Sequence, residues 1–163
     1  MAGAFDPERI LRTLSRRRVR YVLVGATAAR LQGFPRLTAD ADIAPANDPH
    51  NLTRLAAALR DLNARVYTDS IPDGLPFSCD SETLQQANLW NLVTDAGRVD
   101  LVFKPSGTEG YDDLIRSALT YKVFGVEVRA ASLEDILRSK LASDRPQDQQ
   151  DAIVIKEMLK RRK

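Results

Sequence analysis

Thr38-Ala39-Asp40-Ala41-Asp42-Ile43 is the most informative segment of this sequence. We predict a strand over residues 40–44, although aspartate is depleted in strands. Alternate residues of a strand share one face of its sheet, so Asp40 and Asp42 would point to the same side. Two carboxylates held together repel each other, and a divalent cation between them removes that repulsion. The pair is weak evidence by itself, because a surface turn would contain the same residues.

A third aspartate interrupts another apolar segment, Arg98-Val99-Asp100-Leu101-Val102-Phe103. We predict strands over residues 89–94 and 98–103, joined as a hairpin by the turn Asp95-Ala96-Gly97. An acid within such a strand is rarely buried unless it is paired or bound to a metal. Asp100 therefore fits the third carboxylate of a two-metal site, or an edge-strand acid paired with a nearby arginine.

Upstream of the paired aspartates, Val24-Gly25-Ala26-Thr27 joins a predicted strand over residues 21–24 to a helix from about 27 to 31. A glycine that opens a helix leaves backbone N–H groups free and lets an anion approach closely. The segment is neither a dinucleotide-binding glycine fingerprint nor a Walker loop. Its position just before the aspartates is what makes it informative.

The remaining periodicity predicts a helix that begins at Asp6-Pro7-Glu8 and a loop over residues 70–81. Further helices are predicted over 48–62, 109–119, 133–142 and 147–160, and a strand over 123–128. This order indicates an α/β (α+β) fold, with a mixed sheet, helices packed on it and a helical C-terminal segment.

The composition is that of an ordinary globular protein, with 44% hydrophobic and 28% charged residues over 163 positions, a length typical of one domain. No apolar run approaches the roughly 20 residues that span a bilayer, and the N-terminus lacks the apolar core of a signal peptide. We therefore expect a cytoplasmic protein without a membrane segment.

Cys79 is the single cysteine and His50 the single histidine, which excludes an internal disulfide and argues against a Cys/His zinc site. His50 lies in a polar helix start, so we expect it to face solvent. Catalysis would then depend on carboxylates, lysine, arginine, hydroxyls and a hard metal ion that prefers oxygen ligands.

The net charge is only +2, but the basic residues gather at both ends of the chain. Such clusters can follow a phosphate backbone, or they can be a solvated helix face and a frayed tail. The clusters are Arg9, Arg12, Arg16, Arg17, Arg18 and Arg20 at the start, and Lys156, Lys160, Arg161, Arg162 and Lys163 at the end.

Lys140 breaks the pattern of the helix predicted over 133–142, because it lies on the apolar stripe of that helix. A lysine there usually keeps its stem buried and its amine wet. The other interpretation is a cation directed at a triphosphate, with Arg145 beside it. In the following helix, Asp148 and Asp151 fall near the apolar face.

In this order, these segments resemble the DNA polymerase β-like nucleotidyltransferase superfamily, and most closely the AbiEii and Men-type nucleotidyltransferase toxins of bacterial toxin–antitoxin systems. The matching segments lie at residues 24–28, 33–43, 99–102 and 132–151, and together they span about residues 20–155. The resemblance implies one nucleotidyltransferase domain over 1–163, with its core at about 20–130 and its helical C-terminal segment at about 131–163.

The resemblance also implies a role for each matching residue. Asp40, Asp42 and Asp100 would bind Mg²⁺ or Mn²⁺, and Asp100 would help to activate the attacking hydroxyl. The residues implied for the nucleoside triphosphate are Gly25, Ala26 and Thr27 at the β- and γ-phosphates, Lys140 and Arg145 as neutralising cations, and Asp148 or Asp151 to orient the lysine. Relatives usually carry Gly or Ser at the position of Ala26, so one hydroxyl contact is missing unless Thr27 supplies it.

By the same resemblance, the protein would be a toxin that adds nucleotides, often pyrimidines, to the 3′ acceptor end of tRNA, which blocks aminoacylation and translation. Its partners would be tRNA and a cognate antitoxin, and a kinase-like antitoxin would modify Thr27 or Thr38. Two alternatives stay open: nucleotide transfer to a protein or small-molecule hydroxyl, and a catalytically silent, antitoxin-like binding module.

Overall fold

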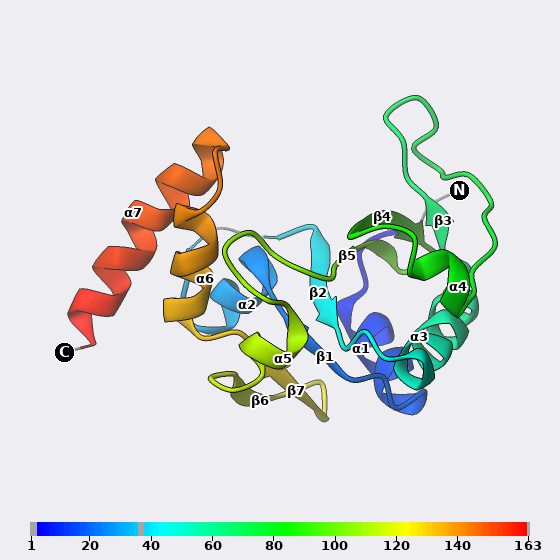
Figure 1. Ribbon diagram of the computed structural model, residues 1–163, viewed down its shortest axis with the longest axis horizontal. Coiled ribbons are helices and arrows are strands. Elements are labelled where there is room, and N and C mark those ends of the chain that lie inside the picture. Colours follow the sequence, from blue (N-terminus) through cyan, green and yellow to red (C-terminus); the bar gives the residue numbers. More distant parts are fainter. Residues whose placement is uncertain (1–2, 36–37, 163) are drawn as a thin grey trace.

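The computed structural model describes residues 3–35 and 38–162. Arg36 and Leu37 of the second matching segment, and Lys163 of the C-terminal basic cluster, lie outside the described residues. Within the described part, seven strands form one mixed sheet in the order β3-β4-β5-β2-β1-β7-β6 (Figure 1). The predicted α/β architecture with a mixed sheet and packed helices is confirmed.

Two parallel pairings, β2 with β5 and β1 with β7, join antiparallel segments of the sheet. The segments predicted as strands at 21–24, 40–44, 89–94 and 98–103 correspond to β1, β2, β4 and β5. The strands are β1 (Tyr21–Leu23), β2 (Asp40–Pro45), β3 (Arg65–Val66), β4 (Leu89–Thr94), β5 (Gly97–Val102), β6 (Leu119–Val123) and β7 (Val126–Ala130).

Oxygen-bearing side chains begin several of the helices, as helix capping requires. Asp6, Asp48 and Ser132 each accept a hydrogen bond from the backbone N–H three residues further on. The helices are α1 (Pro7–Arg16), α2 (Gly25–Leu31), α3 (Pro49–Asp61), α4 (Ser81–Leu84), α5 (Tyr111–Leu114), α6 (Leu133–Leu141) and α7 (Pro146–Arg161).

The two faces of the sheet have different surroundings, and this difference positions the site. Ala41 and Ile43 of β2, with Val99 and Leu101 of β5, are buried in the core that also contains the apolar residues of α1 and α3. Because strand side chains alternate, the aspartates of β2 and β5 point to the opposite face. That face is not covered by α1 and α3, while α6 and α7 pack against each other at one side of the sheet (Figure 1).

Two predictions about residues 109–128 are wrong. The helix expected over 109–119 is only α5, because residues from Leu119 onward pair with β7 as strand β6. The strand expected over 123–128 is divided by a turn in which Phe124 and Gly125 have φ values of 53° and 75°. Positive φ at both central residues is typical of a two-residue hairpin turn, so the segment reverses direction instead of continuing.

Asn51 of α3 ties the ends of β1 and β2 to the helix. It is completely buried, accepts from the Arg20 N–H at 2.7 Å, and donates to the carbonyls of Arg20 and Ala46 at 2.9 and 2.8 Å.

Asn51→Ala should lower the free energy of unfolding by about 2–4 kcal/mol, because it leaves buried backbone groups without partners. Urea denaturation measures this. Thr53→Ala, at an exposed site of the same helix, should change stability by less than about 0.5 kcal/mol, and equal losses in both variants would contradict the assignment.

Candidate active site

Strand register brings the three sequence-predicted acids together. In the parallel pairing of β2 with β5, Asp42 lies opposite Asp100 and Asp40 lies opposite Arg98. One carboxylate oxygen from each of Asp40, Asp42 and Asp100 lies within 4.8 Å of the other two. Three half-buried oxygens at this separation fit a hard divalent cation such as Mg²⁺, whose preferred ligands are carboxylates.

The electrostatics of the cluster favour a bound cation. Burial, together with the neighbouring charges of Asp40 and Asp100, raises the pKa of Asp42 from 3.8 to about 8. Burial also raises the pKa of Asp100, to about 6, although Arg98 opposes that rise. At neutral pH the metal-free cluster therefore resists full ionisation, and a divalent ion would relieve that resistance.

Gly25 allows the turn before α2 to approach the acids. Its φ is +60°, and a Cβ atom built at this position would lie 2.7 Å from Oδ2 of Asp42. Any other residue would meet both a strained backbone and a clash. The turn at Val24, Gly25 and Ala26, which the sequence predicted to hold phosphate and which is called the phosphate turn below, is therefore in direct contact with the acid pair. These three residues line the same cleft as the acids.

Thr27 connects the phosphate turn to β2. Its hydroxyl donates to the Asp40 carbonyl at 3.1 Å and accepts from the Asp42 N–H at 3.2 Å. This hydroxyl fixes the start of α2 against the strand that carries the acids, a role that the sequence did not reveal. Thr38, on the other side of the pair, donates to the Asp40 carbonyl at 2.7 Å.

Arg98 and Tyr67 are neighbours of the site that sequence reasoning missed. The Arg98 guanidinium lies 3.8 Å from the centroid of the Tyr67 ring, and its Nη2 is 3.4 Å from Oδ1 of Asp100. Asp100 thus has both of its predicted environments at once, the acid cluster and an arginine. It is not an edge-strand residue, because β5 lies between β4 and β2.

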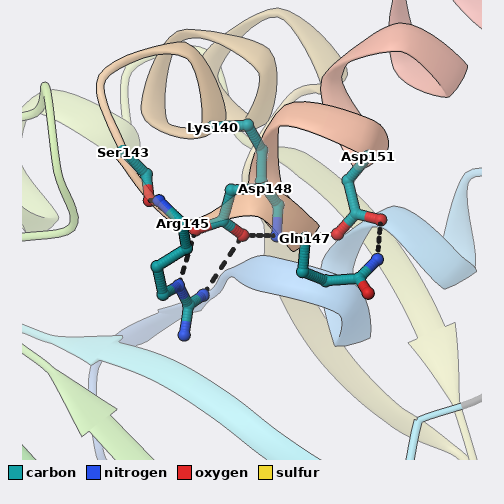
Figure 2. A network of polar contacts seen from close by, with 6 residues as sticks. All are labelled: Lys140, Ser143, Arg145, Gln147, Asp148 and Asp151. Atoms are coloured by element: carbon teal, nitrogen blue, oxygen red, sulfur yellow. Dashed lines mark hydrogen bonds and ion pairs between the residues drawn. The ribbon is translucent and has the colours of Figure 1, made fainter.

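On the other side of the cleft, α6 and α7 hold a network of charged groups (Figure 2). Lys140 Nζ donates to Asp148 at 2.8 Å and to Asp151 at 3.1 Å, and its side chain is only 13% exposed. Lys140 is therefore held by acids instead of reaching into solvent. Both candidate orienting residues contact it, and Gln147 in turn donates to Asp151 at 2.9 Å.

Asp148 is the centre of this network. It accepts two hydrogen bonds from Arg145, at 2.8 and 3.1 Å, and one from the Ser143 hydroxyl at 2.6 Å. Burial alone would raise the pKa of Asp148, but the hydrogen bonds from Arg145, Lys140 and Ser143 lower it far below its usual range. The Arg145 side chain is 77% exposed, so it remains accessible to a ligand in the cleft.

A single cavity of about 940 Å³ joins these groups. The acids of β2 and β5 lie on it together with the phosphate turn, and Lys140, Arg145 and Asp148 line it from α6 and α7. Two cations and two acids balance in the α6–α7 network, so the three acids of the sheet leave the cleft negative. A triphosphate would then need divalent metal in order to bind.

The N-terminal basic cluster does not line this cavity. Arg9, Arg12 and Arg16 belong to α1 on the covered side of the sheet, and Arg17, Arg18 and Arg20 lie in the connection from α1 to β1. Three of these six arginines make ion pairs with nearby acids. These pairs are Arg12 with Glu8, Arg17 with Asp61, and Arg20 with Asp48. His50 is exposed at the start of α3, as the sequence predicted.

Neither a protein-family model nor a curated protein matches this sequence. Among solved structures, the chain is similar to that of the antibiotic-resistance factor ANT(2″)-Ia, with 18% identity, coverage of 94% of this chain and 82% of that one, and a TM-score of 0.57. It is also similar to a Thermotoga maritima protein assigned as a nucleotidyltransferase, with 18% identity, coverage of 98% and 97%, and a TM-score of 0.56. The chain therefore has the nucleotidyltransferase fold that its sequence motifs predicted.

No helix within the described residues is long and apolar enough to cross a membrane.

The raised pKa of Asp42 predicts a pH-dependent stability. A carboxyl with a pKa of about 8 in the folded protein and 3.8 as its reference stabilises the fold fully below about pH 4. That contribution is lost as the pH rises through about 8. In chelator, Asp42→Asn should match the parent protein at low pH and melt higher at alkaline pH, by about 2–4 °C for each kcal/mol.

Adding Mg²⁺ at alkaline pH should make the parent protein melt at a higher temperature than Asp42→Asn. The parent binds the ion through Asp42, and the variant lacks that ligand. Thermal melts at both pH values measure the effect. Asp69→Asn, at an exposed loop position, is the matched control and should follow the parent throughout. Equal stabilisation of all three proteins by Mg²⁺ would contradict a metal site at the acid cluster.

Proposed function

We propose that this protein is a metal-dependent nucleotidyltransferase that uses nucleoside triphosphates. One observation carries the proposal: the acids of β2 and β5 lie in the same cavity as the phosphate turn, with Lys140 and Arg145 on the α6–α7 side. The fold, which the chain has in common with nucleotidyltransferases, supports the same conclusion.

In this proposal, each group has a chemical task. Mg²⁺ or Mn²⁺ held by Asp40, Asp42 and Asp100 would supply Lewis-acid stabilisation of phosphate charge. Gly25, Ala26 and Thr27 bring backbone N–H groups to the β- and γ-phosphates. Arg145 and Lys140 balance the charge of the departing pyrophosphate.

Asp100 accepts the proton of the attacking hydroxyl, because the β2–β5 register places its carboxylate in the acid cluster where that hydroxyl would enter. The acceptor oxygen forms a bond to the α-phosphorus as the bond from that phosphorus to the bridging oxygen breaks. Asp148 and Asp151 act indirectly, because they hold Lys140 in the cleft.

For the acceptor, we propose the 3′ end of tRNA, which would make the protein a toxin that blocks aminoacylation. The similarity of residues 24–28, 33–43, 99–102 and 132–151 to AbiEii and Men-type toxins supports this acceptor. A small-molecule hydroxyl is the second candidate for the acceptor. It is supported by the similarity in fold to an antibiotic-resistance factor, which covers 94% of this chain.

A partner antitoxin would control such a toxin, and Thr27 and Thr38 are the hydroxyls that a kinase-like partner would modify. A phosphate on Thr27 would remove the hydrogen bond that its hydroxyl donates to the Asp40 carbonyl, and one on Thr38 would bring negative charge beside Asp40. Mass spectrometry of the protein co-expressed with its genomic neighbour tests this, and full inhibition with both threonines unmodified would favour steric blocking.

Substitutions in the acid cluster and at Lys140 should distinguish the role of the metal ligands from the role of the lysine. Asp42→Asn should abolish nucleotide transfer, and chelator should do the same to the parent. Lys140→Ala should lower kcat/KM by about 30- to 1,000-fold, the effect of losing one preorganised electrostatic donor. Lys122→Ala, at an exposed site of β6, is the control and should be fully active. Pyrophosphate release measures the rates, and unchanged activity in Lys140→Ala would remove that residue from the mechanism.

The acceptor can be identified with nucleotides labelled at the α-phosphate. Incubation with tRNA, total protein and a panel of polyhydroxylated amines, followed by separation, should place the label on tRNA 3′ ends. Label on protein or on a small molecule would replace the proposed acceptor while keeping the enzyme class. If no molecule is labelled although NTP binds, the protein is a silent binding module.

A further inference from the structure

The two walls of the active-site cavity differ in chemistry. The α6–α7 wall carries the network of charged groups that includes Lys140, Arg145 and Asp148, whereas the wall formed by β4 and the end of β5 carries amides and aliphatic side chains, with Lys104 just beyond β5. Asn91 and Leu89 of β4 project there, on the other side of the acids from the cations. Asn91 lies directly opposite Asp100 in the β4–β5 register.

In-line displacement assigns these walls to different substrates, provided that the proposed nucleotidyl transfer is correct. The attacking oxygen enters opposite the leaving group, so pyrophosphate and acceptor lie on opposite sides of the α-phosphorus. If the cations of α6 and α7 hold the pyrophosphate, the acceptor lies against β4 and β5, where its hydroxyl reaches Asp100.

The β4–β5 wall combines an exposed apolar side chain with an exposed amide. Leu89 is 52% exposed, and it pairs with Val102 of β5. Asn91, two residues further along β4 on the same face, exposes its side-chain amide beside Leu89. An apolar surface next to a hydrogen-bonding amide suits the flat face and polar edge of an unpaired base.

A second cavity, of about 470 Å³, continues from this wall. Asn88 and Lys104 line both cavities, and they are bonded to each other through the Lys104 N–H and the Asn88 side-chain oxygen at 2.8 Å. Its volume is sufficient for one nucleoside, and amide side chains can read base edges. The second cavity is lined by Phe103, Tyr111, Asn47, Gln85 and Gln86, among others.

Lys104 lies where the two cavities meet. It makes an ion pair with Glu109 at 3.3 Å, and the two side chains are 61% and 81% exposed. So exposed a pair contributes little stability, and the lysine could exchange its carboxylate for a phosphate at small cost.

We propose that the two cavities are consecutive subsites for the last two nucleotides of a single-stranded nucleic-acid acceptor. The terminal nucleoside lies on Leu89 and Asn91 with its hydroxyl at Asp100. The penultimate base occupies the second cavity, and Lys104 binds the phosphate that links the two. Recognition therefore depends on bases and one phosphate, and no residue of the N-terminal basic cluster lines either cavity.

Fluorescence anisotropy tests this without requiring transfer. The probes are a labelled nucleoside, dinucleotide and trinucleotide of RNA with free 3′ ends, added with Mg²⁺ and a non-hydrolysable NTP. The dinucleotide should bind about 10- to 100-fold more tightly than the nucleoside, the scale of one stacked base and its contacts. The trinucleotide should bind less than about twofold more tightly than the dinucleotide, because the dinucleotide already fills both subsites.

Two variants probe the second subsite. The variants are Ala87→Trp, which fills the second cavity from an exposed position, and Lys104→Gln. Each should remove most of the increase in affinity from nucleoside to dinucleotide and leave the affinity for NTP unchanged. Lys122→Gln, at the far edge of the sheet, is the charge-matched control and should bind like the parent. Equal affinity for all three probes, unaltered binding in both variants, or preference for a polyhydroxylated amine would overturn the inference. Dinucleotide preference without any nucleotide transfer would support the subsites and contradict the proposed enzyme.

Discussion

Repulsion among Asp40, Asp42 and Asp100 is the constraint around which the rest of this structure is arranged. The pairing of β2 with β5 holds three carboxylate oxygens within 4.8 Å, and burial together with the charges of Asp40 and Asp100 raises the pKa of Asp42. The buried side of the same strands, with Ala41, Ile43, Val99 and Leu101 in the core, opposes any rotation that would separate the acids. Core packing thus sustains an arrangement whose repulsion is relieved by protonation of Asp42 or by a bound cation.

Opposite charges in the same cleft do not cancel this repulsion, because the cations of α6 and α7 are already balanced. Asp148 and Asp151 hold Lys140, and Asp148 also holds Arg145, so the network is rigid and nearly neutral before any ligand arrives. A preorganised cation loses little freedom when phosphate binds, which is the usual benefit of such networks in catalysis. The exposed Arg145 is the member best placed to change partners.

The location of the basic residues bears on how a nucleic acid would approach. Three of the six arginines near the N-terminus belong to α1, behind the sheet, and three of the six pair with acids, among them Arg17 with Asp61. The open wall of β4 and β5 has few cations but exposes Leu89 and Asn91. A single-stranded end recognised through its bases suits such a wall better than a duplex backbone, whose binding depends on many phosphate contacts.

The sequence alone predicted the mixed sheet, its central strands, the two C-terminal helices and the identity of the three acids. These predictions depended on local signals, such as alternation in β2 and β5 and the glycine that opens α2. The region from 109 to 128 was mispredicted for the same reason, since the turn at Phe124 and Gly125 exists only because β6 pairs with β7.

Tertiary structure decided which side chains meet. Lys140 is eight and eleven positions from the acids that hold it, and Arg98 reaches Tyr67 only because β3, β4 and β5 lie side by side. The same is true of Thr27, whose hydroxyl bonds to a strand that begins thirteen residues later. Periodicity shows the face on which a side chain lies, whereas its partners depend on strand order, register and helix docking, which are properties of the whole chain.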